Sequence, residues 1–204
     1  MSEVQKQVAL AEMSFLRAFF YFELVQQFGS IPLVLDVSFD VRTDFPRASV
    51  ADIYNQIIKD LEYSVQYSPE KPAKTGKAAK YAAAHLLAKV YLTRGSAVSD
   101  QRGQQPSDME NALKYAKMVI DCGQYELLTN FADLWDINNQ CNKEVIFSVQ
   151  FTTDPVYRGD GNSFHLYWGS WYEDQPGMTR DLENGRPYRR HLQSQKTMLQ
   201  LFDR

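Results

Sequence analysis

The chain contains 204 residues, of which 44% are hydrophobic and 13% aromatic, and its formal net charge at pH 7 is −3. This composition is typical of a globular protein that can bury a sizeable core, and it excludes an intrinsically disordered chain. The small negative charge provides neither the basic surface that binds nucleic acid nor a polybasic membrane patch, so we expect no nucleic-acid partner.

The sequence shows no membrane span, no secretion signal and no cysteine motif. No run of about 18 apolar residues is present. Met1-Ser2-Glu3 does not begin a signal peptide, because no apolar segment with a small-residue cleavage site follows it. Cys122 and Cys141 are too far apart for a CxxC redox or zinc motif, so we interpret them as two unlinked structural cysteines.

The first predicted element is a long helix over about residues 3–28, which Gly29 ends because glycine adopts a positive φ readily. Strongly polar residues are few between positions 15 and 28, so we expect neighbours to surround this helix on most sides. Arg17 is then expected to pair with a carboxylate or carbonyl groups, since an unpaired buried guanidinium would be prohibitive. The predicted core face contains Val4, Val8, Ala11, Phe15, Ala18, Phe22 and Val25.

Capping and helix-breaking residues delimit the second and third helices. The second begins at Ser49, with Asp52 three residues later as its partner in the cap, and Pro69 and Pro72 close it. The third spans about residues 80–94 and stops at Gly95. The positions expected to face the core are Ile53, Ile57, Leu61 and Val65 in the second helix, and Ala83, Leu86, Leu87, Val90 and Tyr91 in the third.

The fourth helix is predicted to begin with a capping box of Ser107 and Glu110 and to end at Gly123. The polar loop 96–106 before it is typical of a segment that is either mobile or engaged with another group. Helix pairs in succession, without a strict 34-residue period, predict a mainly α fold, an irregular tetratricopeptide-like stack. The expected core positions of the fourth helix are Ala112, Leu113, Ala116, Val119 and Ile120.

The character of the sequence changes after Gly123. A short helical turn is expected over residues 131–135, and the apolar, β-branched and aromatic run 144–151 predicts a strand. Regular periodicity disappears over residues 152–190, which indicates a decorated loop region, and residues 195–202 have the spacing of a short helix. The predicted parts, within one domain, are a helical scaffold, 1–123, and a strand- and loop-rich region, 124–204.

Four motifs follow one another along nearly the whole chain. They are RAF at residues 17–19 running into GSIPL at 29–33, GKAAKYAAAHLLAKVYL at 76–92, VIDCGQYEL at 119–127 followed by NKEVIF at 142–147, and MLQLFDR at 198–204. In this order and spacing they resemble the SusD/RagB family of outer-membrane nutrient-binding lipoproteins. Ala79 departs from the family's usual Ser or Thr, and the loss of that N-cap side chain should cost about 1 kcal/mol.

The resemblance implies a function at the cell surface. It implies a non-catalytic protein that binds an oligosaccharide or polysaccharide nutrient at the outer membrane and has a SusC-like TonB-dependent transporter as its partner. Family members are commonly longer at both ends. We therefore expect this chain to be a truncated member, from which the signal peptide and the lipid-bearing cysteine are missing.

Aromatic residues in the decorated loop are the candidate ligand-binding residues. A sugar lays its apolar face on an aromatic ring while polar side chains fix its hydroxyls. In an extended segment Tyr167 and Trp168 would face opposite sides, so not all of these residues can share one surface. Packing of two or more of them onto the helices is about as good an interpretation, and the resemblance favours binding. The candidates are Tyr167, Trp168, Trp171 and Tyr172.

Two other functions stay open. A helical protein-interaction scaffold without a small ligand would use the same loop in its core or against a partner. A glycoside hydrolase needs two carboxylates on opposite sides of the scissile bond, whereas carboxylates in a polar loop are far more often solvated. The candidate acids are Glu173, Asp174, Asp181 and Glu183. We expect no catalytic residues.

No metal or other cofactor is expected either. Asp160-Gly161-Asn162 is typical of a turn, because the alternating acidic ligands and distal Glu of a calcium loop are missing. The three histidines, His85, His165 and His191, lack metal-ligand spacing and are interpreted as structural or exposed.

Overall fold

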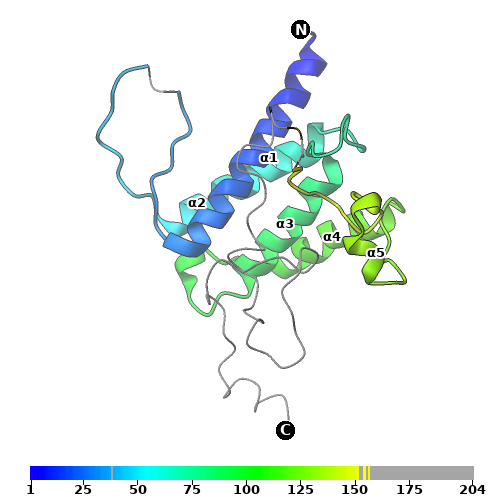
Figure 1. Ribbon diagram of the computed structural model, residues 1–204. Helices are drawn as coiled ribbons and strands as arrows, with labels where there is room; N and C mark the ends of the chain where they lie inside the picture. The colour runs from blue at the N-terminus through cyan, green and yellow to red at the C-terminus, as the bar shows by residue number, and fades with distance from the viewer. Residues whose placement is uncertain (38, 152–153, 155, 157–204) are drawn as a thin grey trace, which may run out of the picture. The chain divides into compact units, whose positions relative to one another are not determined.

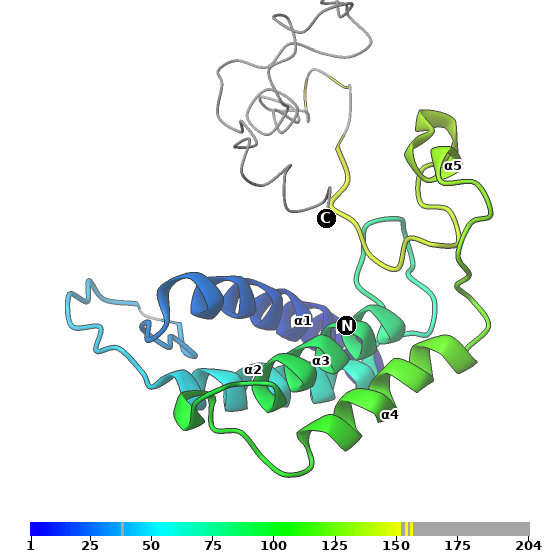
Figure 2. The same cartoon turned by 90° about the horizontal axis from the view of Figure 1, so that it is seen from below.

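A computed structural model describes residues 1–37, 39–151, 154 and 156 of the chain. Its elements form a mainly α fold (Figure 1), as predicted. Each long helix packs on the next, so that Figure 2 shows a stack in the order α1, α2, α3, α4. The elements are α1 (Glu3–Phe28), α2 (Val50–Tyr67), α3 (Lys80–Gly95), η1 (Asp100–Arg102), α4 (Asp108–Asp121), α5 (Ala132–Trp135) and η2 (Ile137–Asn139).

These elements all belong to one compact unit, Met1–Val149. None of the described helices is both long and apolar enough to cross a membrane. The helix predicted over residues 195–202 and most of the decorated loop lie outside the described residues.

Helix α1 has the predicted bounds. Ser2 Oγ accepts a hydrogen bond from the Gln5 backbone N–H, and Gln5 Oε1 accepts one from the Ser2 N–H, a capping box that the sequence analysis missed. Gly29 ends the helix with φ +67°, as its position predicted. Arg17 makes the predicted ion pair, since its Nε and Nη2 donate to the Asp60 carboxylate at 2.7 and 2.6 Å.

The burial of α1 corrects one expectation. Five of its 26 residues are buried, namely Ala11, Phe15, Ala18, Phe22 and Val25, and the predicted core residue Val4 is exposed. Among the described helices only α2 and, to a small extent, α3 pack against α1, so one side of it is covered. Phe20 and Phe28 on the other side are 60% and 62% exposed. The apolar composition of α1 therefore does not reflect burial on most sides.

The helix that neighbours surround is α3, which lies between α2 and α4. Eleven of its 16 residues are buried, against five of 26 in α1. Small side chains at 82–84 and 88 let the flanking helices approach closely. All the predicted core positions of α2 and α3 are buried. The sequence pattern therefore identified the core of these two helices correctly.

Helix α4 differs from the prediction at both its start and its buried face. Ser107 makes no capping hydrogen bond. Asp108 fixes this turn instead, because its carboxylate accepts from the Gln105 N–H at 2.9 Å and pairs with Arg94. Tyr115 stacks on Tyr91 with ring centroids 5.9 Å apart, which places the buried stripe along residues 108, 112, 115 and 119. Of the predicted core positions, Ala112 and Val119 are buried, Ala116 is half-buried, and Leu113 and Ile120 are exposed.

The strand predicted over residues 144–151 is not formed. The described residues contain no strand, only one isolated bridge between Pro32 and Arg47. Within this run, Ile146 and Phe147 pack against the helical core. A strand needs a neighbouring backbone for its hydrogen bonds. The run is apolar because it covers helices. Helix α5 confirms the helical turn that was predicted just before this run.

Candidate ligand-binding site

The predicted aromatic platform, Tyr167, Trp168, Trp171 and Tyr172, lies outside the described residues, as do the candidate acids Glu173, Asp174, Asp181 and Glu183. His165, His191 and the turn at residues 160–162 lie outside them too. Among the residues that the structure describes, no three His, Cys, Asp or Glu side chains come together as a metal site.

A cavity of about 380 Å³ lies among three segments that are distant in the sequence. They are the loop between α2 and α3 at residues 71–77, the turn after α4 at 124–125, and the segment 141–148. This volume is within the range of small-molecule sites. We call this the lysine cavity, after Lys71, Lys77 and Lys143 in its lining.

Two aromatic rings that the core holds in place line this cavity. Tyr125 packs edge-on against Tyr81, with ring centroids 6.3 Å apart, and Phe147 packs edge-on against Phe15 at 5.0 Å. Both Tyr125 and Phe147 are half-buried, so each ring has one side in the core and one side toward the cavity. Rings held in this way present apolar surface at a low entropic cost on binding.

The polar part of the lining is basic. Lys77 Nζ lies 2.9 Å from Glu12, and Lys143 Nζ lies 2.8 Å from Glu126. No carboxylate among the described residues lies within ion-pair distance of Lys71, and the described lining contains no Asp or Glu. The lining therefore offers ammonium groups, amides and hydroxyls, which suits a ligand rich in oxygen acceptors.

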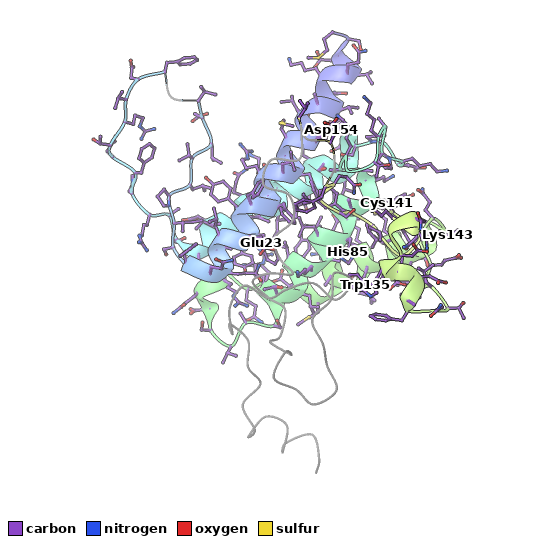
Figure 3. The ribbon with its side chains drawn as sticks, viewed as in Figure 1. Glu23, His85, Trp135, Cys141, Lys143 and Asp154 are labelled. Carbon is purple, nitrogen blue, oxygen red and sulfur yellow. The ribbon has the colours of Figure 1, made fainter. Side chains whose placement is uncertain are left out.

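Hydrogen bonds near the cavity fix the segment that presents Lys143. Asn142 Oδ1 accepts from the Glu144 N–H at 3.0 Å, and its Nδ2 donates to the Asn139 carbonyl at 3.0 Å. The Glu144 carboxylate in turn accepts from the Leu128 N–H at 2.9 Å. Cys141 and Lys143 lie on this segment, beside α5 (Figure 3). The strand predicted over residues 144–151 includes Glu144 but not residues 141–143, and the sequence pattern did not indicate the cavity.

An apolar hollow of about 400 Å³ lies on the other side of Tyr125 and Ile146, which line both spaces. His85 of α3 and Ile120 of α4 also line it. Partial burial lowers the pKa of His85 below its ordinary value, and the nearby Lys89 ammonium lowers it further. Glu126 and Glu144 also line this hollow, so His85 lies in a lining that is mainly but not wholly apolar.

A second aromatic feature lies on α5. The rings of Phe131 and Trp135 meet edge to face with centroids 5.9 Å apart, and the residues are 73% and 70% exposed. An exposed pair of large aromatic side chains is available for contact with a ligand or partner. The sequence pattern predicted the helical turn but not this exposed pair, for which two aromatic residues four positions apart are a usable signal.

Comparison with known proteins identifies relatives of the chain. Residues 2–92 match a family model for SusD-like proteins, described as "starch-binding associating with outer membrane". The chain is 33% identical over 176 residues to a SusD-like protein of Bacteroides ovatus, across 84% of this chain and 29% of that protein. This confirms the resemblance that the sequence motifs suggested.

Solved structures agree with this relationship. A SusD superfamily protein of Bacteroides fragilis superposes with a TM-score of 0.67 and 28% identity, over 81% of this chain and 34% of that one. A crystal structure described as being with xylogluco-oligosaccharide gives a TM-score of 0.67 and 31% identity, over 74% and 31%. The chain thus spans about a third or less of the length of these relatives. The motifs, the matched family model and the shared helical fold show that the chain belongs to the SusD-like family.

Proposed function

We propose that this chain is part of a non-catalytic protein that binds an oligosaccharide or polysaccharide nutrient at the outer-membrane surface. The observation that carries the proposal is membership of a family described as starch-binding and associating with the outer membrane. A similar structure is described as being with xylogluco-oligosaccharide, which supports a carbohydrate ligand. The family resemblance further suggests that the ligand passes to a SusC-like TonB-dependent transporter.

The chemistry of the described residues agrees with sugar binding. The lysine cavity combines aromatic rings with ammonium, amide and hydroxyl groups, the combination that contacts both the apolar face and the hydroxyls of a pyranose. A glycosidase would need a pair of carboxylates, and the described lining of this cavity supplies none. We retain Tyr167, Trp168, Trp171 and Tyr172 as the proposed stacking residues.

Calorimetric titration of the purified chain with a panel of soluble oligosaccharides and polysaccharides tests the proposal. We expect binding without turnover of the saccharide. Trp168→Ala and Trp171→Ala should weaken binding, while Trp135→Ala, a matched change on α5, reports whether the exposed pair contributes. Circular dichroism of each variant checks that the helices persist. A folded chain that binds no saccharide contradicts the proposal.

The alternative is a protein-interaction scaffold without a small ligand. The exposed apolar side of α1 favours it, because large apolar side chains in one patch often mark a protein contact. This patch contains Leu10, Met13, Phe20, Leu24 and Phe28. A chain that binds none of the saccharides but binds the transporter directly would support this alternative.

A further inference from the structure

We propose that the lysine cavity binds an acidic saccharide, that is, a sugar that carries a negatively charged group. The inference rests on the proposed function, since it names the class of saccharide that this part of the chain would take. It also assigns residues of the described unit, in addition to the aromatic loop, to ligand contact.

The charge distribution around the cavity carries the inference. The chain has a net charge of −3, yet the three charged side chains that line the cavity are all lysines, Lys71, Lys77 and Lys143. Lys71 has no carboxylate partner among the described residues. A negative group in the cavity would meet ammonium groups from two different loops without facing a carboxylate in the lining.

The existing ion pairs of Lys77 and Lys143 do not prevent these two lysines from binding a ligand anion. The Lys143–Glu126 pair is largely exposed on both sides, and Lys77 is half exposed, so water competes with both pairs and each contributes little. The partners Glu12 and Glu126 lie outside the lining. A ligand anion can therefore share these ammonium groups, each of which has three donors.

The uncharged part of the lining favours a sugar over a bare anion. Tyr125 and Phe147 offer ring surface for the apolar face of a pyranose, and the core holds both rings in place. The amides of Gln124 and Asn142 supply donors and acceptors for hydroxyl groups. One of the two N–H groups of the Asn142 amide donates to Asn139, which leaves the other for a ligand hydroxyl.

Digalacturonate and its neutral methyl ester are the matched probes for this cavity. Both would be titrated calorimetrically into the purified chain, with a neutral gluco-oligosaccharide and inorganic sulfate as further ligands. The variants are Lys71→Gln and Lys143→Gln in the lining. Lys59→Gln, on the exposed side of α2 and outside the lining, makes the same change in net charge and serves as the control.

We expect digalacturonate to bind at least about fivefold more tightly than its ester, and each lining variant to weaken the acid about three- to fivefold. The affinity for the ester should stay unchanged in both lining variants. Lys59→Gln should cause at most a small loss of affinity for digalacturonate, which added salt abolishes. This pattern would support the inference.

Equal affinities for the acid and the ester, or an unchanged affinity in Lys71→Gln, would overturn it. So would sulfate that binds as tightly as digalacturonate, because the cavity would then select an anion and not a sugar. Neutral saccharides that bind while digalacturonate binds no more tightly than its ester would overturn this inference and leave the proposed function standing. A chain that binds no saccharide at all contradicts both.

Discussion

Arg94 and Asp108 join the last turn of α3 to the first turn of α4 through a buried ion pair with two hydrogen bonds. Arg94 Nε donates to Asp108 Oδ2 at 3.0 Å and Nη2 donates to Oδ1 at 2.6 Å, with the two side chains 7% and 0% exposed. Arg94 Nη1 also donates to Asn55 Oδ1 at 3.1 Å, which adds α2 to the network. One buried pair therefore connects three successive helices.

Asp108→Asn should lower the free energy of unfolding by about 3–5 kcal/mol, because it leaves the Arg94 guanidinium buried without its counter-charge. Urea or guanidinium denaturation followed by circular dichroism measures the change. Glu126→Gln breaks the exposed pair with Lys143 and is the control, with an expected loss of at most about 1 kcal/mol. Equal losses of unfolding free energy in the two variants would show that the buried pair stabilises the fold no more than the exposed pair.

Gly95→Ala should destabilise the chain although alanine favours a helix by about 1 kcal/mol over glycine. A Cβ atom built at Gly95 would lie 2.8 Å from Asp108 Cβ, closer than two carbons can approach. The helices α3 and α4 would have to separate at their ion pair, with an expected net loss of about 1–3 kcal/mol. Ser96→Ala, at the exposed next position, should change stability little, and a Gly95→Ala variant more stable than the parent would refute the close approach.

Ala79→Ser should raise the free energy of unfolding by about 1 kcal/mol. Ala79 is the N-cap residue of α3, with extended backbone at φ −132° and ψ 172°, and no side chain caps the helix there. A hydroxyl at this position can accept from a free N–H of the first turn. Ala78→Ser adds the same group one residue too early and should give no gain. A loss of stability in Ala79→Ser would mean that the buried site cannot accommodate the oxygen.

The N-cap of α4 shows why local pattern alone fails at some positions. Ser107 and Glu110 have the spacing of a capping box, yet the turn is organised by Asp108, whose partner Arg94 lies 14 residues earlier. The bounds of α1, α2 and α3 could be predicted because their stop and start signals are local. A buried ion pair between helices has no local signature, so its effect on α4 could not be foreseen.

The same limit explains why the strand prediction was wrong and why the cavity was not predicted. The run that contains Ile146 and Phe147 has strand-like residues, but apolar residues mark burial without saying whether the neighbour is another strand or a helix. Lys71 and Lys143 come together only because the stack of helices brings their loops to one place. Sequence spacing therefore predicted most of the helical core, and the site depended on tertiary contacts.

The pKa of His85 should be measurably below its ordinary value of 6.5, because partial burial and the Lys89 ammonium both disfavour the charged ring. The unfolded chain then binds this proton more tightly than the folded chain. The contribution of His85 to stability is complete above about pH 6.5 and is lost as the pH falls from there through the folded pKa. Stability should therefore decline over that window.

NMR titration of the imidazole protons measures this pKa, and His85→Gln identifies the resonance among those of the three histidines. Lys89→Gln should raise the pKa of His85 by part of the shift, since burial is the larger cause. Lys59→Gln should leave it unchanged. A His85 pKa at or above 6.5 in the parent chain would contradict the partly buried position beside Lys89.

Phe22 and Phe20 should respond very differently to truncation, because α1 is covered on one side only. Phe22 is fully buried against Tyr54, with ring centroids 6.2 Å apart, whereas Phe20 is 60% exposed. Phe22→Ala should cost about 3–5 kcal/mol through lost burial and the cavity left behind. Phe20→Ala should cost less than about 1 kcal/mol. Denaturation of both variants compares them directly, and a large loss in Phe20→Ala would mean that this side of α1 is covered in solution.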